Sequence, residues 1–241
     1  MEPEEEQSQG DAQLKKLDLS LSFDEIGGYA LPIVFYITII FTTAFVIYHG
    51  FLPIIFGWSL SDFVLWSLPI LLTGIVFHEL IHGICFALLS GKPLSFVKYG
   101  FDKATLTPYA HCKTPIAAWV YKVGALMPAI ILGVFPFIVS IATGNPYLFF
   151  FGTFFTTAAC GDFIVFWIIK NVNNKALVED HPKKAGCYIY TENTAEVKEI
   201  KLPGKKAHFF QKVYRIPFLF LVACTGAIFG YRVFRAISFY L

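Results

Sequence analysis

Residues 78–82 read His-Glu-Leu-Ile-His, two histidines four positions apart with a glutamate directly after the first. On a helix, residues four apart share one face, so His78 and His82 can offer imidazole nitrogens to a single metal ion. Glu79 is rotated to one side, where it can hold a metal-bound water and accept its proton. Zinc lowers the pKa of such a water to about 7. The spacing therefore predicts a hydrolytic Zn2+ site with Glu79 as the catalytic base.

A catalytic zinc usually has three protein ligands, so the motif lacks one. Glu79 and Asp162 are the two acidic residues deep inside apolar stretches, where a charge is costly and usually functional. His78 and Asp162 each lie fifteen residues after the start of their predicted helices, at matching depth. Small residues flank both positions and would let the two helix backbones approach. We predict that His78, His82 and Asp162 bind the metal; the alternative for Asp162 is a structural hydrogen bond or a pair with Lys122.

Several other polar residues could approach the metal, but a structural reading is the more common one for each. His111 and Cys112 lie in a polar loop and could serve as inhibitory or substrate-binding groups. Asp180 and its neighbours precede a proline, which favours a turn. Glu179 and His181 share this turn-and-cap interpretation with Asp180. The remaining candidates are an interfacial, packing or water-path set: His49, His208, Cys160, Thr156, Thr157 and Tyr121.

The elements that carry these residues are apolar enough for a membrane. Hydrophobic residues make up 56% of the 241 residues and charged residues only 15%, which excludes a disordered chain and argues against an ordinary soluble domain. A spanning helix needs about 20 mostly apolar residues. The sequence predicts an all-α polytopic membrane protein of about five transmembrane helices, with the HExxH motif on the second and Asp162 on the fourth. The predicted spans are 31–48, 63–89, 115–141 with kinks at Pro128 and Pro136, 147–169, and a fifth from Ile216; residues 51–58 form an interfacial or re-entrant segment.

Charge outside these spans predicts the orientation. Residues 91–114 hold four Lys and residues 170–215 hold ten Lys or Arg, whereas the loops 49–62 and 143–146 hold none. The positive-inside rule then places the N-terminus and both Lys-rich segments in the cytoplasm. A net charge of +2 is too small to indicate a nucleic-acid partner. The five cysteines form no CxxC motif and are expected to be free thiols.

Four regions follow from this pattern. The loop 91–114 alternates in a way that favours a small β-hairpin. The acidic N-terminus has none of the basic character of a cleaved secretory signal. The predicted regions are an acidic, disordered cytoplasmic tail (1–28), a membrane-embedded metallopeptidase core (29–170), a cytoplasmic Lys-rich segment (171–215) and a C-terminal transmembrane or amphipathic helix (216–241).

At these motifs the chain resembles the site-2-protease-like intramembrane zinc metalloproteases and, more closely, a mainly bacterial family of membrane zincin peptidases. The resemblance implies zinc ligation by His78, His82 and Asp162, general-base catalysis by Glu79, and a site open to the cytoplasmic side of a bacterial cytoplasmic membrane. It departs from the better-known proteases in one respect, because here Gly161 precedes Asp162 instead of following it. The motifs that carry the resemblance are HELIHG (78–83), Pro128 and Pro136, Ala-Cys-Gly-Asp (159–162), and Asp180-His181-Pro182 with Gly186.

These observations predict a membrane-embedded zinc metallopeptidase whose partners are the lipid bilayer and a membrane protein or peptide substrate. The hairpin could hold an extended substrate strand by β-addition. Two rivals remain at this point. One is a zinc-binding membrane protein without proteolytic activity, acting as a regulator or scaffold. The other is a transporter, since transporters also place acidic residues at the bilayer midplane.

Overall fold

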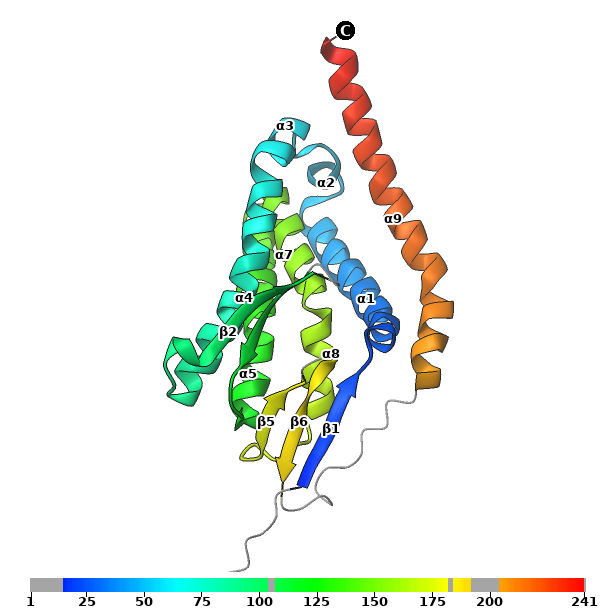
Figure 1. Ribbon diagram of the computed structural model, residues 1–241. Helices are drawn as coiled ribbons and strands as arrows, with labels where there is room; N and C mark the ends of the chain where they lie inside the picture. The colour runs from blue at the N-terminus through cyan, green and yellow to red at the C-terminus, as the bar shows by residue number, and fades with distance from the viewer. Residues whose placement is uncertain (1–14, 104–106, 182–183, 192–203, 241) are drawn as a thin grey trace, which may run out of the picture.

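The computed structural model describes residues 15–103, 107–181, 184–191 and 204–240. The part of the predicted tail before residue 15 therefore lies outside the described residues. Most of the described chain is helical, with two small sheets (Figure 1). The helices are α1 (Phe23–His49), α2 (Leu52–Phe56), α3 (Leu60–Asp62), α4 (Leu68–Ser90), α5 (Ala118–Pro128), α6 (Phe135–Thr143), α7 (Pro146–Ala158), α8 (Cys160–Ile169) and α9 (Gly204–Tyr240). The strands are β1 (Lys15–Leu21), β2 (Val97–Asp102), β3 (Thr107–Cys112), β4 (Ile116–Ala117), β5 (Leu177–Asp180) and β6 (Ala185–Thr191).

Three helices in the described residues are long and apolar enough to cross a membrane, instead of the expected five. They are Phe23–His49, Val64–Ser90 and Ala118–Thr143. The pair α7 and α8 would be a fourth if it is counted as one span, but it bends by 43° at Ala159. The fifth span expected from Ile216 is the second half of α9, which is not among these candidates within the described residues. Large apolar side chains on the outer face of α4 are exposed, among them Leu72, Val76 and Phe77, as a lipid-facing helix requires.

Proline shapes the third candidate span as expected. Pro128 ends α5, and a π-helical segment (Ala129–Val134) follows it before α6 begins. A proline removes one backbone donor and crowds the preceding turn, so a helix bends or widens beside it. α7 and α8 meet at Ala159 without a proline, and the bend there places Asp162 in the first turn of α8.

The β content is larger than the sequence analysis predicted. The hairpin expected in residues 91–114 is present as β2 and β3, which pair antiparallel from Val97 with Cys112 to Asp102 with Thr107. A second, four-stranded antiparallel sheet has the order β1-β6-β5-β4. Its first strand lies in the segment assigned to the disordered tail, and its central strands lie in the Lys-rich segment. The all-α assignment was therefore incomplete.

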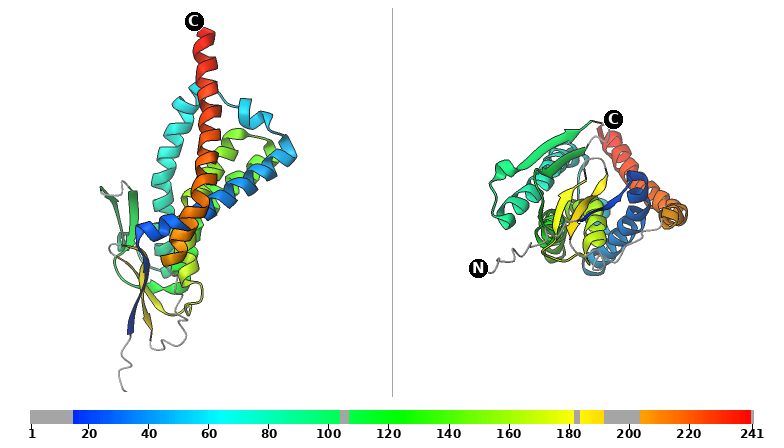
Figure 2. Two further views of the ribbon diagram at one scale, coloured as in Figure 1. Left: turned by 90° about the vertical axis from the view of Figure 1, so that its right-hand side faces the viewer. Right: turned by 60° about the horizontal axis from the view of Figure 1, so that its bottom comes forward.

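The four-stranded sheet lies at one end of the helical bundle, where β1 leads directly into α1 through a Ser22–Glu25 capping box (Figures 1 and 2). A buried core joins this sheet to the helices, with Val178 and Ile189 from the sheet against Val120 and Ile168 from α5 and α8. α9 packs along α1, and its C-terminal end extends past the other helices (Figures 1 and 2). The end of the bundle that carries the four-stranded sheet positions the side chains described next.

Candidate metal centre

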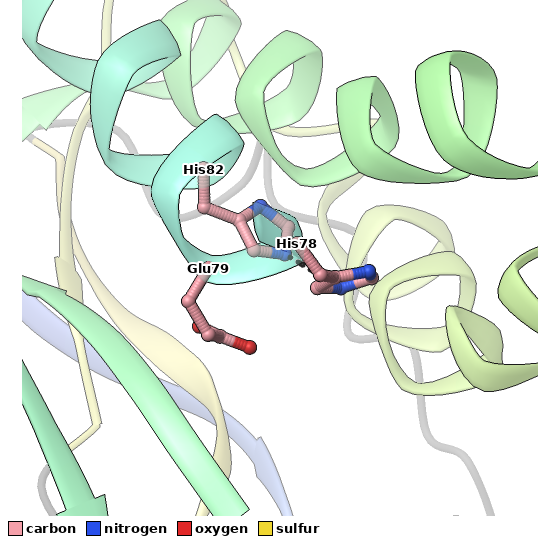
Figure 3. Close-up of side chains that lie close together, drawn as sticks. All are labelled: His78, Glu79 and His82. Carbon is pink, nitrogen blue, oxygen red and sulfur yellow. Dashed lines mark hydrogen bonds between the residues drawn. The ribbon is translucent and has the colours of Figure 1, made fainter. Parts of the chain in front are cut away.

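The HExxH residues all lie on α4, within the span Val64–Ser90. The candidate ligand atoms of His78, Glu79 and His82 lie within 4.8 Å of one another. Figure 3 shows both imidazoles on one side of the helix and the Glu79 carboxylate beside them. The Nε2 atoms of His78 and His82 are 3.2 Å apart. A helical spacing of four thus brings the two imidazoles together as predicted.

Asp162, on α8, faces the same two nitrogens. Its Oδ2 lies 3.1 Å from His78 Nε2, and its Oδ1 lies 3.4 Å from His82 Nε2. Ligand atoms about 2.0–2.2 Å from a tetrahedral zinc ion are about 3.3–3.6 Å apart, so the separations of 3.1–3.4 Å are within about 0.2 Å of those around a shared ion. The donor set of two imidazoles and one carboxylate also suits zinc.

His82 is oriented by a backbone group on the far side of its ring. Its Nδ1–H donates to the carbonyl oxygen of Gly124, on α5, at 2.9 Å. That hydrogen bond leaves Nε2 as the nitrogen that faces His78 and Asp162. Metal-binding histidines commonly have such a partner, which fixes the tautomer and the ring orientation. Phe86 stacks between His82 and Tyr121 and so supports the same geometry.

The small residues around the motif were predicted to bring α4 and α8 together, and the structure shows that they do not. The space beside Gly74 is taken by the Phe155 ring, and the space beside Gly83 by the Tyr99 side chain of the hairpin. A Cβ atom added at Gly161 would meet nothing within 4 Å. Instead, α5 packs against both α4 and α8. The close approach that the small residues permit is therefore made with the hairpin and with α7.

The structure shows what several of the other polar candidates contact. Lys122 does not pair with Asp162, because its ammonium donates to the carbonyls of Lys170 and Val172 and to the side chain of Asn174. Thr156 and Thr157 donate to carbonyls of their own helix and His49 contacts the carbonyl of Ile141, so these three are structural. Glu179 accepts from Tyr190 and pairs with Lys16. His208 is exposed on α9.

A cavity of about 730 Å³ opens beside the metal centre. Glu79, His82 and Asp162 line it together with His111, Tyr121 and Asp180, for which a structural role was the more common interpretation from the sequence. Three lysines line it as well: Lys98, Lys103 and Lys184. The HExxH motif alone carries no signal for these residues, since they come from the hairpin, α5 and the four-stranded sheet.

The part of the chain that contains the HExxH motif and Asp162 matches a known family model. Residues 71–177 match the family model described as "Putative zincin peptidase". The matched segment contains His78, Glu79, His82 and Asp162, and the zincin family implies a zinc cofactor. The match supports a metallopeptidase in general terms. No curated protein and no solved structure matches the chain.

Proposed function

We propose that this protein is a membrane-embedded zinc metallopeptidase that hydrolyses peptide bonds of membrane or membrane-proximal substrates. The observation that carries the proposal is the convergence of His78 Nε2, His82 Nε2 and the Asp162 carboxylate at 3.1–3.4 Å, with Glu79 beside them in an open cavity. His78, His82 and Asp162 would hold the ion. Bound zinc supplies Lewis-acid activation of a water molecule and of the substrate carbonyl group.

The chain's own residues handle the proton and the substrate. Glu79 takes a proton from the attacking water and delivers it to the amine nitrogen that leaves as the peptide bond breaks. A glutamate in this position serves no purpose in a protein that only binds zinc, which favours hydrolysis over the scaffold alternative. The cavity admits a chain segment to the site.

The hairpin offers a place for an extended substrate. β2 and β3 form a two-stranded sheet, and β3 packs against α4. Ala110, on β3, lines the cavity together with Glu79. An extended substrate strand that adds to this sheet would therefore run beside the metal centre. Such a mode requires the substrate to be unwound near the cleaved bond.

The proposed orientation places the N-terminus and the Lys-rich segments together in the cytoplasm. The pairing of β1 with β6 supports this, because it joins the N-terminal segment to the segment after α8 at one end of the bundle. The cavity is lined from the same sheet by Asp180, His181 and Gly186. We therefore propose that the site opens toward the cytoplasmic side.

The test uses the purified full chain in detergent micelles, with zinc content measured by mass spectrometry. The substrate probe is a pool of quenched fluorescent peptides with randomised positions. Glu79→Gln should retain zinc and lose hydrolysis. Glu25→Gln is the matched control, because glutamine at that position still completes the capping box of α1 and Glu25 is not among the residues that line the cavity. Hydrolysis that persists in Glu79→Gln with zinc bound, or zinc-loaded wild-type protein that cleaves nothing in the pool, would overturn the proposal.

A further inference from the structure

A carboxylate outside the proposed metal centre, that of Asp180, faces the same cavity, and its side chain is only 13% exposed. Asp180 ends β5, and both of its oxygens are engaged. The Tyr121 hydroxyl donates to Oδ1 at 2.5 Å, and the Cys112 backbone N–H donates to Oδ2 at 2.9 Å. Because α5, β3 and β5 each contribute one of these groups, the position of the carboxylate is fixed by three elements.

The third neighbour of Asp180 is the imidazole of His111. Nδ1 of His111 lies 3.6 Å from Asp180 Oδ2. The His111 side chain is 34% exposed and lines the cavity together with Glu79, His82 and Asp162. With Nδ1 turned toward Asp180, Nε2 is the nitrogen left to contact a molecule in the cavity. His111 also follows Ala110, which lines the same cavity as Glu79.

The surroundings of Asp180 suit a carboxylate that orients a partner. Burial raises the pKa of Asp180, while hydrogen bonds from Tyr121 and Cys112 and the nearby His111 act in the opposite direction. A buried carboxylate is costly unless it is hydrogen-bonded, and here one oxygen remains in contact with an ionisable ring. A purely structural tie between the sheet and the hairpin would need only the Tyr121 and Cys112 bonds.

We propose that His111 is a second catalytic residue, which donates a hydrogen bond from Nε2 to the carbonyl oxygen of the scissile peptide bond as negative charge develops there. In its protonated form the ring donates through both nitrogens, with Nδ1 directed to Asp180. Asp180 and Tyr121 are then positioning residues. This inference rests on the proposed peptidase function.

The expected effect on kcat follows from the contribution that one hydrogen-bond donor makes to stabilising the transition state. Removing one donor to a developing oxyanion typically lowers kcat by about 10²–10³-fold. His111→Ala should show a loss of this size, with KM changed less than about threefold, because the contact strengthens only as charge develops. Zinc content should be unchanged, since His111 is not a ligand. Added imidazole should restore part of the activity of His111→Ala.

The positioning residues should behave differently. Asp180→Asn and Tyr121→Phe should lower kcat by about 10-fold and respond to imidazole no more than wild type, because His111 is still present. His208→Ala is the matched control, an exposed histidine on α9 outside the cavity. Kinetics are measured on the member of the quenched peptide pool that is cleaved fastest, with the full zinc-loaded chain. If Asp180→Asn fails to fold, Tyr121→Phe still tests whether these residues position His111.

The outcomes separate this inference from the proposed function. Wild-type kcat in zinc-loaded His111→Ala, alongside an inactive Glu79→Gln, would overturn only the role of His111. A rise in KM without a fall in kcat would also overturn it, as would a loss of zinc on His111→Ala. Zinc-loaded wild-type protein without Glu79-dependent hydrolysis would overturn the peptidase proposal itself.

Discussion

The contact between α4 and α5 at Gly124 gives a quantitative test of how the metal centre is supported. A Cβ atom added at Gly124 would lie 2.4 Å from Cε1 and 2.5 Å from Cδ1 of Phe86. Phe86 is 4% exposed and is held between His82 and Tyr121, so the ring has little freedom to turn away. An unstrained carbon contact of about 3.5 Å therefore requires α4 and α5 to separate by about 1 Å.

That separation reaches the His82 ring. The Gly124 carbonyl accepts from His82 Nδ1 at 2.9 Å, and a further 1 Å takes the pair beyond hydrogen-bonding distance. Losing the outer partner of a metal-binding histidine typically costs about 10–100-fold in metal affinity. Gly124→Ala should therefore weaken zinc binding by about 10–100-fold, or about 1.4–2.7 kcal/mol.

The assay is competition for zinc between the purified protein and a chromophoric chelator. Gly27→Ala is the matched control, because it adds the same methyl group to α1 where nothing lies within 4 Å. Zinc affinity within twofold of wild type for a folded Gly124→Ala protein would contradict this role of the contact between Gly124 and His82. So would an equal loss in both variants, since the effect would then be unrelated to His82.

Three further predictions concern the proposed ligand Asp162, the neighbouring Gly161, and the thiols of Cys112 and Cys187. Asp162→Asn should lower bound zinc well below one per chain, and X-ray absorption of the wild-type protein should show nitrogen and oxygen ligands at about 2.0–2.2 Å without sulfur; a sulfur shell would contradict the ligand set. Gly161→Ala should keep zinc binding and activity, because its added methyl meets nothing within 4 Å; loss of zinc there would show a contact that the structure lacks. Burial raises the pKa of Cys112 and of Cys187, so their thiolates are scarce at pH 8 and alkylation, followed by mass spectrometry, should be slow until the protein is denatured. Alkylation of both at the rate of a free thiol at pH 8 would be inconsistent with their burial.

The placement of the motif residues could be predicted from the sequence because it is local. His78 and His82 meet through helical periodicity alone, and Asp162 stood out because charge is so scarce in the apolar stretches. The hairpin followed from alternation. His111, Tyr121 and Asp180 could not be assembled in the same way, since they are brought to the cavity by packing among α5, β3 and β5.

The errors also have physical causes. β1 was missed because acidic residues precede it, although Leu17, Leu19 and Leu21 alternate with polar residues toward the sheet interior. The sequence predicted one helical span over residues 147–169, since no proline near Ala159 marks a break. The small residues near His78 were correctly read as sites of close approach, but composition cannot say which element approaches.

The pairing of β1 with β6 sets an order on the assembly of the protein during synthesis. Lys15 pairs with Thr191, so β1 cannot be completed until β6 has left the ribosome. At about 5–20 residues per second, the N-terminal strand waits on the order of 10–35 s, while the intervening helices have already been synthesised. His78, His82 and Asp162 are all synthesised before β6. The proposed metal ligands can therefore come together first, and the sheet that lines the cavity is completed last.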